Sequence, residues 1–103
     1  MNKELLKQQI EDVIKTIYDP EIPVNIWELG FIYDIKVEEN RNVEILMTLT
    51  APNCPVAETL PLEVKDKVSG IAGVGDVQIN ITFDPPWDMD KMSEAAKLEL
   101  GLL

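Results

Sequence analysis

The 103-residue sequence contains no histidine and only one cysteine, Cys54. The absence of histidine excludes the Cys–His pair of common thiol enzymes, and one cysteine forms neither an internal disulfide nor a Cys-x-x-Cys redox pair. Structural zinc and iron–sulfur sites commonly use four Cys or His ligands, so this chain would have to share such a site with another chain. These absences argue against a self-contained enzyme, and the lack of a disulfide is typical of a reducing cytoplasm.

Basic residues are also scarce. Nine Lys and Arg stand against 19 Asp and Glu, which gives a formal net charge of −10. Such a charge repels nucleic acids and anionic membrane surfaces, because proteins bind both by neutralising phosphates with cations. We therefore expect neither as a partner. The acidic surface would suit a basic protein partner, although the need for solubility alone accounts for it.

Long apolar runs are missing as well. No stretch approaches the roughly 20 apolar residues needed to span a bilayer. The first seven residues are mixed in charge and lack the apolar run of a signal peptide. Hydrophobic residues nevertheless make up 46% of the chain, which is typical of a folded globular protein. These features predict one domain over residues 1–103, located in the cytoplasm.

Three segments carry apolar residues at helical spacing. The first covers residues 2–17 and must end near Tyr18, because Pro20 disfavours helical dihedrals at the residue before it. The second follows Cys54, where Pro61 predicts either a kink or a short first turn followed by a main helix over residues 61–69. The third covers residues 90–100, with Gly101 as its cap.

Three other segments, residues 31–38, 43–50 and 76–83, alternate apolar and polar residues as β-strands do. The polar residues 39–42 connect the first two strands as an antiparallel hairpin. The order α-β-β-α-β-α predicts an α/β (α+β) two-layer sandwich, in which helices cover one face of a three-stranded mixed sheet. The other face is predicted to be polar, with Thr48, Thr50, Gln78, Asn80 and Thr82.

The loops carry proline, glycine and acidic residues. Residues 18–30 are predicted to form a packed, irregular segment, whose carboxylates Asp19, Glu21 and Glu28 would be solvated or cap a turn unless they serve a site. The glycine-rich residues 70–75 follow a helix and precede a strand, the reverse of a phosphate-binding loop, so we expect a turn. Residues 84–87, Asp-Pro-Pro-Trp, must leave the sheet because proline donates no ladder hydrogen bond.

Cys54 lies between two prolines at the predicted start of a helix. Unpaired N–H groups and the helix dipole favour a thiolate there, whereas the net charge of −10 and burial oppose one. A small, buried, hydrophobic cysteine is an equally good interpretation of the residues alone. With no histidine and no second thiol beside it, Cys54 is better suited to coordinating something than to independent catalysis.

Several motifs resemble the PaaD-like and SufT-like family of iron–sulfur cluster assembly proteins, long described as a domain of unknown function. They are D-P-E-I-P-V-N-I-W-E-L-G-F-I-Y-D at 19–34, M-T-L-T-A-P-N-C-P at 47–55, G-V-G-D-V at 73–77, D-P-P-W at 84–87 and the tail M-S-E-A-A-K-L-E-L-G. They follow in order along nearly the whole chain. The resemblance implies an α/β fold of the kind predicted above. Nucleotide-dependent steps would belong to a partner, because the P-loop ATPase fused to some relatives is not in this sequence.

The resemblance also implies a site and a role. The family's T-x-P-x-C-P cysteine falls on Cys54, its acidic loop motif on Asp19 and Glu21, and its strand threonines on Thr48 and Thr50. The chain would be a non-enzymatic accessory factor in cluster assembly or delivery, with Cys54 as a metal ligand or client contact. It would bind iron or a cluster transiently, with no permanent cofactor, and meet scaffold or client proteins. A homodimer would let two Cys54 thiolates share one cluster.

Two alternatives remain open on the sequence. A metal-free adaptor would bind scaffolds or clients through its acidic surface and the Pro-Pro-Trp segment, with Trp87 as the contact residue. Packing of Trp87 on the sheet is the simpler interpretation of the same residue. A thiol enzyme or oxygenase subunit is the weaker alternative, because no general base accompanies Cys54.

Overall fold

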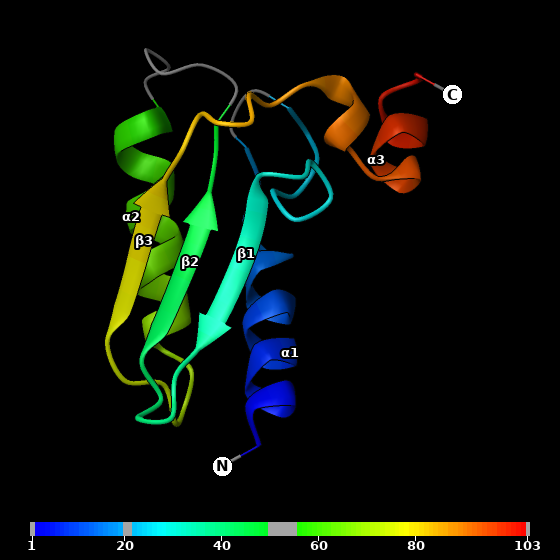
Figure 1. The fold of residues 1–103 in the computed structure, drawn as a ribbon. Helices are drawn as coiled ribbons and strands as arrows, with labels where there is room; N and C mark the ends of the chain where they lie inside the picture. The colour runs from blue at the N-terminus through cyan, green and yellow to red at the C-terminus, as the bar shows by residue number, and fades with distance from the viewer. Residues whose placement is uncertain (1, 20–21, 50–55, 103) are drawn as a thin grey trace.

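The computed structural model describes residues 2–19, 22–49 and 56–102. The elements follow in the predicted order, α-β-β-α-β-α, with one short 3₁₀ helix before the last α-helix (Figure 1). They are α1 (Lys3–Ile14), β1 (Ile32–Val37), β2 (Val43–Met47), α2 (Val56–Ser69), β3 (Val77–Ile81), η1 (Met89–Lys91) and α3 (Glu94–Glu99). Each strand is shorter than predicted, because the alternating pattern extends past the residues that pair.

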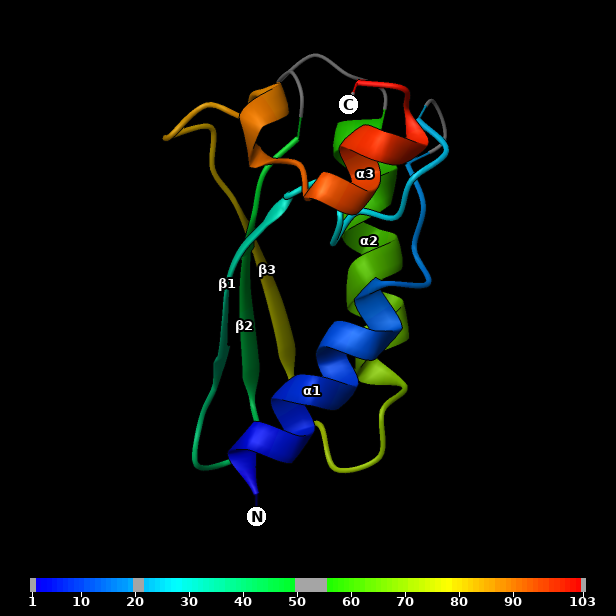
Figure 2. The ribbon, with the colours of Figure 1, turned by 90° about the vertical axis from the view of Figure 1, so that its right-hand side faces the viewer.

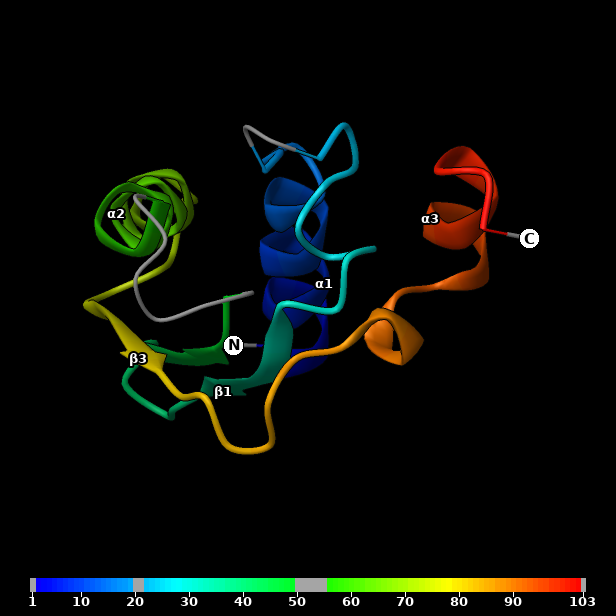
Figure 3. The same cartoon turned by 90° about the horizontal axis from the view of Figure 1, so that it is seen from above.

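The sheet has the order β1-β2-β3 and is mixed, as predicted. β1 and β2 form an antiparallel hairpin in which Ile35 faces Ile45, and β3 lies parallel to β2 with Ile79 beside Ile45. The β2–α2–β3 crossover is right-handed: with α2 behind the sheet, β3 lies to the left of β2 (Figure 1). Figures 2 and 3 show α1 and α2 on the same face of the sheet.

The core lies between this face and the two helices. Its side chains come from the apolar stripes of α1 and α2, from the inward positions of the strands, and from the loop between α1 and β1. The largest fully buried side chains are Phe31, Ile10, Ile14, Ile17, Ile26, Leu29, Ile45, Met47, Leu49, Val64, Val68 and Thr48. The predicted two-layer sandwich is confirmed, and its core extends into the segment that was predicted to be irregular but packed.

Helix α1 begins where Asn2 caps it, with Asn2 Oδ1 accepting a hydrogen bond from the Leu5 N–H at 3.1 Å. It ends at Ile14, earlier than the predicted boundary at residue 17. The next residues form single turns, in which Ile17 N–H bonds the Ile14 carbonyl at 3.0 Å. Ile17 thus stays buried, which explains why the apolar periodicity outlasts the helix.

Helix α2 runs from Val56 to Ser69 with Pro61 inside it. The sequence interpretation in which the main helix starts at Pro61 is therefore wrong. Leu60, Val64 and Val68 are buried and fix the inward face of the helix on both sides of the proline. Packing of this apolar face compensates for the hydrogen bond that Pro61 cannot donate.

The single helix predicted over residues 90–100 is two helices. η1 is capped by Asp88, and α3 is capped by Ser93, whose Oγ accepts from Ala96 N–H at 3.1 Å. Gly101 ends α3 with a φ of 76°, and Leu102 N–H bonds the Lys97 carbonyl at 2.7 Å. This is the Schellman arrangement, so the predicted glycine cap is confirmed.

The sheet face opposite α1 and α2 is here called the open face. Residues 82–92, here called the crossing segment, connect β3 with α3 and pass over one end of this face (Figure 3). Tyr33 donates a hydrogen bond to the Pro85 carbonyl at 2.8 Å, and Trp87 Nε1 donates to the Leu29 carbonyl at 2.8 Å. The Trp87 ring meets Phe31 edge-on at 5.6 Å between centroids. The segment therefore leaves the ladder, as predicted for residues 84–87. It is fixed to Leu29, Phe31 and Tyr33, which lie at or just before the start of β1.

The open face is polar as predicted, with one exception. Asn80 donates to Glu44 at 2.7 Å across the strands, and Gln78 donates to Asn80 at 3.1 Å. Thr48, however, is fully buried. It lies just beyond β2, where its N–H bonds the Phe31 carbonyl at 2.8 Å. Thr48 is buried because chain neighbours continue on either side of β2 beyond the end of the strand.

Gly30 provides a test of the contact between the crossing segment and the β1 entry. Its φ is 80°, and a Cβ there would lie 2.2 Å from the Lys91 carbonyl oxygen. We expect Gly30→Ala to lower the free energy of unfolding by about 2–4 kcal/mol. Gly73→Ala is the matched control, because Gly73 also has a positive φ, 90°, but open space around its Cβ position. The control should cost about 1–2 kcal/mol. Urea unfolding of both variants measures the difference, and equal losses would contradict this contact.

Candidate functional site

The described segments that flank the predicted site residues lie at one end of the molecule (Figure 1). The loop joining α1 to β1, the carboxyl end of β2 and the first turn of α2 share this end (Figures 1 and 2). Of the predicted site residues, the structure describes Asp19 and Thr48, together with Trp87. Glu21, Thr50 and Cys54 lie outside the described residues. Cys54 precedes the first residue of α2 by two positions in the sequence.

Asp19 is buried, with 8% of its surface exposed. Its Oδ1 accepts a hydrogen bond from Ile22 N–H at 3.0 Å, and its own N–H lies 3.5 Å from the Val24 carbonyl. Asp19 therefore closes a turn, as one of the two sequence interpretations held, but it is not solvated. A buried carboxylate held by backbone N–H groups has a fixed orientation, which a flexible surface acid does not have.

Thr48 follows the last residue of β2. Its hydroxyl is buried, and Oγ1 lies 3.4 Å from the Leu49 carbonyl, which is long for an O–H···O bond. The backbone of Thr48 is fixed by its bond to Phe31. The structure thus places this threonine rigidly at the start of the connection to α2.

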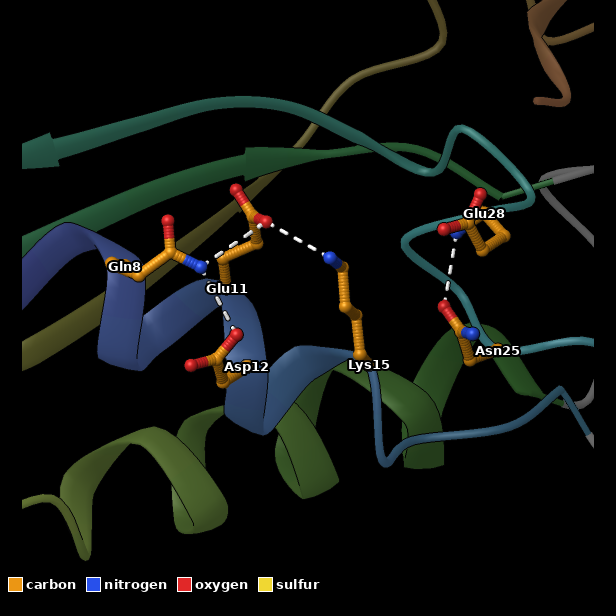
Figure 4. Close-up of polar contacts among 6 residues, drawn as sticks. All are labelled: Gln8, Glu11, Asp12, Lys15, Asn25 and Glu28. Atoms are coloured by element: carbon orange, nitrogen blue, oxygen red, sulfur yellow. Dashed lines mark hydrogen bonds and ion pairs between the residues drawn. The ribbon is translucent and has the colours of Figure 1, made fainter.

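The loop between α1 and β1 is held at several points. Tyr18 and Asn25 form an isolated antiparallel bridge, and Ile26 N–H bonds the Ile17 carbonyl at 2.9 Å. Asn25 Oδ1 accepts from Glu28 N–H at 3.0 Å, which closes a turn (Figure 4). Buried Val24 and Leu29 anchor the loop in the core. The described part of residues 18–30 is therefore packed, as predicted.

Lys15 connects the end of α1 with this loop. Its Nζ lies 3.0 Å from Glu11 Oε2 (Figure 4). The same Nζ lies 6.0 Å from the centroid of the Trp27 ring. The hydrogen bond to Glu11 raises the pKa of Lys15, and the charge of Glu28 acts in the same direction. Because the Lys15 side chain is partly exposed, its ion pair with Glu11 adds little to the stability of the fold.

A cleft of about 260 Å³ lies between the loop and α3. Its polar lining comes from Tyr18, Asn25, Glu28 and Glu99, and its apolar lining from Pro23, Val24, Ala95 and Ala96. Glu28 was predicted only as one of the loop acids, and a shared cleft with Tyr18 and Glu99 was not predicted. No sequence signal could have done so, because Ser93 N–H to the Glu28 carbonyl, at 2.9 Å, is a tertiary contact that sets α3 beside the loop.

The described side chains do not form a metal site by themselves. Within residues 2–19, 22–49 and 56–102, no three His, Cys, Asp or Glu side chains are grouped so that they could hold a metal ion. No helix in these ranges has the length and apolar character needed to cross a membrane.

Trp87 is partly buried, and it spans the space between Phe31 and the Leu29 carbonyl. Its neighbours Pro85 and Pro86 are exposed. The indole thus helps to fix the crossing segment, and Trp87 remains partly exposed next to two exposed prolines.

Comparison with known proteins gives consistent matches. The family described as iron-sulfur cluster assembly protein matches residues 7–81. The chain is 49% identical to the Fe-S protein maturation auxiliary factor of Porphyromonas gingivalis, over 100% of both chains. It is 39% identical to the Fe-S protein maturation auxiliary factor YitW of Bacillus subtilis, over 97% of this chain and 98% of the relative. A crystal structure of the domain of unknown function DUF59 from Bacillus anthracis superposes with a TM-score of 0.90 at 33% identity, covering 97% of this chain and 95% of that one.

The contribution of the Asp19 hydrogen bond to the turn can be separated from that of its charge. Asp19→Ala removes the acceptor for Ile22 N–H, so we expect the free energy of unfolding to fall by about 1 kcal/mol. Asp19→Asn keeps an acceptor oxygen and loses only the charge, and should cost roughly half of that or less. Thermal and urea unfolding measure both. Equal losses in the two variants would show that the charge, rather than the Ile22 bond, holds the turn.

Proposed function

Since the chain belongs to the iron–sulfur cluster assembly protein family, we propose that it acts as an auxiliary factor in the maturation of iron–sulfur proteins. The observation that carries this proposal is the 49% identity, over the full length of both chains, to a protein named for that activity. The cluster or its iron would be cargo, held transiently and passed on. The relatives are named auxiliary factors, so we assign Cys54 the part of a ligand or contact and not of a nucleophile.

The proposed site consists of Cys54 with Asp19, Glu21, Thr48 and Thr50. The topology supports this grouping, because the loop after α1, the end of β2 and the start of α2 meet at one end of the molecule. Asp19 and Thr48 are both buried there and held by backbone hydrogen bonds. Hydroxyl groups near a thiolate would donate hydrogen bonds to a coordinated sulfur, and the carboxylates would supply oxygen ligands to iron.

A single thiolate would not hold a cluster alone, so the remaining ligands would come from a scaffold or client protein. In this arrangement the chain contributes one sulfur ligand and a surface. Ligand exchange then transfers the cargo, because a site with few ligands from each chain releases it readily to a client with a complete set. Ligation of this kind needs no nucleotide from the chain.

A relocated thiol gives the sharpest test of Cys54. After anaerobic incubation with iron and sulfide, the wild type should show the visible absorption of a thiolate-bound iron species, and Cys54→Ser should lose it. The matched control is Cys54→Ser/Ser69→Cys, which keeps one thiol but places it at the exposed carboxyl end of α2. This control should also fail to bind. Identical spectra for the wild type and both variants would rule out ligation by Cys54.

The metal-free adaptor is the second candidate, and the partial exposure of Trp87 next to exposed Pro85 and Pro86 favours it. Trp87→Phe keeps a ring against Phe31 and loses the hydrogen bond to Leu29. Pull-down of a scaffold or client that fails with Trp87→Phe but persists with Cys54→Ser would favour the adaptor. The reverse pattern is expected if Cys54 makes the contact.

A further inference from the structure

Strand β3 forms an edge of the sheet, and within the described part of the chain its outer backbone groups have no partner strand. Val43 N–H bonds the Asp76 carbonyl at 2.8 Å, and Thr82 N–H bonds the Met47 carbonyl at 2.9 Å. In a parallel ladder, this pattern directs the backbone groups of Gln78 and Asn80 toward β2. Those of Val77, Ile79 and Ile81 point away from it, and no described residue bonds them.

The two edges of the sheet differ in how they are protected. β1 has an irregular register between Ile32 and Asp34, carries the charged Asp34 and Lys36, and packs against α1. Bulges, charges and a covering helix are the usual means of preventing pairing at an edge. β3 likewise packs against a helix, α2, but it has neither a bulge nor a charge. From Val77 to Phe83 its sequence, V-Q-I-N-I-T-F, has no charge and no proline, in a chain whose net charge is −10.

We propose that two copies of this chain associate by antiparallel pairing of β3 with β3, with Ile79 on the two-fold axis. Val77 then faces Ile81 of the partner subunit, and each outward pair exchanges both N–H···O bonds. The two three-stranded sheets become one continuous sheet. This surface lies on β3 and does not depend on the function proposed for Cys54.

Charge and backbone bonding select this register. With Ile79 at the centre, Asp76 faces Thr82 of the partner subunit, so no carboxylates oppose each other across the ladder. Shifting the centre to Asn80 would set Asp76 against Asp84 of the partner subunit, which is unfavourable. Shifting it to Gln78 would require the N–H of Gly75, which already bonds the Arg41 carbonyl at 2.9 Å.

The side chains along β3 also favour a second copy as the occupant. In the Ile79-centred register, Gln78 faces Asn80 of the partner subunit, so two amide side chains that both donate and accept meet on the open face. On the helical face, Ile81 is 38% exposed in one copy and would be covered. An isologous contact of this kind needs a self-complementary strand, and an uncharged one is the form least opposed by two acidic chains.

Sedimentation equilibrium of the purified protein tests the association. The wild type should dimerise, and its dissociation constant should fall as salt rises, because screening weakens the repulsion between chains of charge −10. Ile81→Lys, at the exposed edge, should raise that constant by about tenfold or more. Leu98→Lys is the matched control: it adds the same charge at a 67% exposed position on α3 and should not raise the constant.

Hydrogen exchange of wild-type amides supplies a readout that does not depend on a variant. The amides of Gln78, Asn80 and Thr82 should be protected at every concentration, because they bond β2. Those of Val77, Ile79 and Ile81 should gain protection only as the dimer forms. The proposal is overturned if the wild type stays monomeric, if these three amides exchange rapidly at all concentrations, or if Ile81→Lys dimerises as well as the wild type.

Discussion

The parallel pairing of β2 with β3 is the constraint on which the rest of the structure depends. Two parallel strands cannot be joined by a tight turn, so the chain must leave β2 at its carboxyl end and return through a helix. The connection to α2, which contains Cys54 in the sequence, therefore starts at the same end as the loop after α1. The topology brings together three segments that are well separated in sequence.

The crossing segment stabilises this end from the open side of the sheet. Trp87 bonds the Leu29 carbonyl and packs on Phe31, while Lys91 approaches so near to Gly30 that only glycine fits. The loop after α1 is thus held from both sides: by Ile17 and Lys15 of the first helical segment and by the chain that follows β3. Asp19, at the start of this loop, is fixed by the same packing.

Much of the fold could be predicted from the sequence, because local patterns determine it. The alternation around Ile35, Ile45 and Ile79 gives the strands, and Gly101 gives the cap of α3. The patterns did not locate the ends of elements. Ile17 continues the apolar period of α1 from a turn. Ser93 caps a separate helix through its side chain, while its N–H bonds the Glu28 carbonyl, a tertiary contact that no local rule reports. The burial of Thr48 also depends on a tertiary contact, because its N–H bonds the Phe31 carbonyl.

The candidate site was predicted through resemblance more than through geometry. The resemblance implies site positions at Asp19 and Thr48, which are both buried, whereas the approach of Glu99 to Glu28 depends on the docking of α3. The central claim is that the chain assists the maturation of iron–sulfur proteins. Its most direct test is the rate at which an apo iron–sulfur enzyme regains activity from a loaded scaffold when the chain is added. We predict a faster recovery with the wild type and none of that gain with Cys54→Ser. A rate unchanged by the wild-type chain would contradict the account.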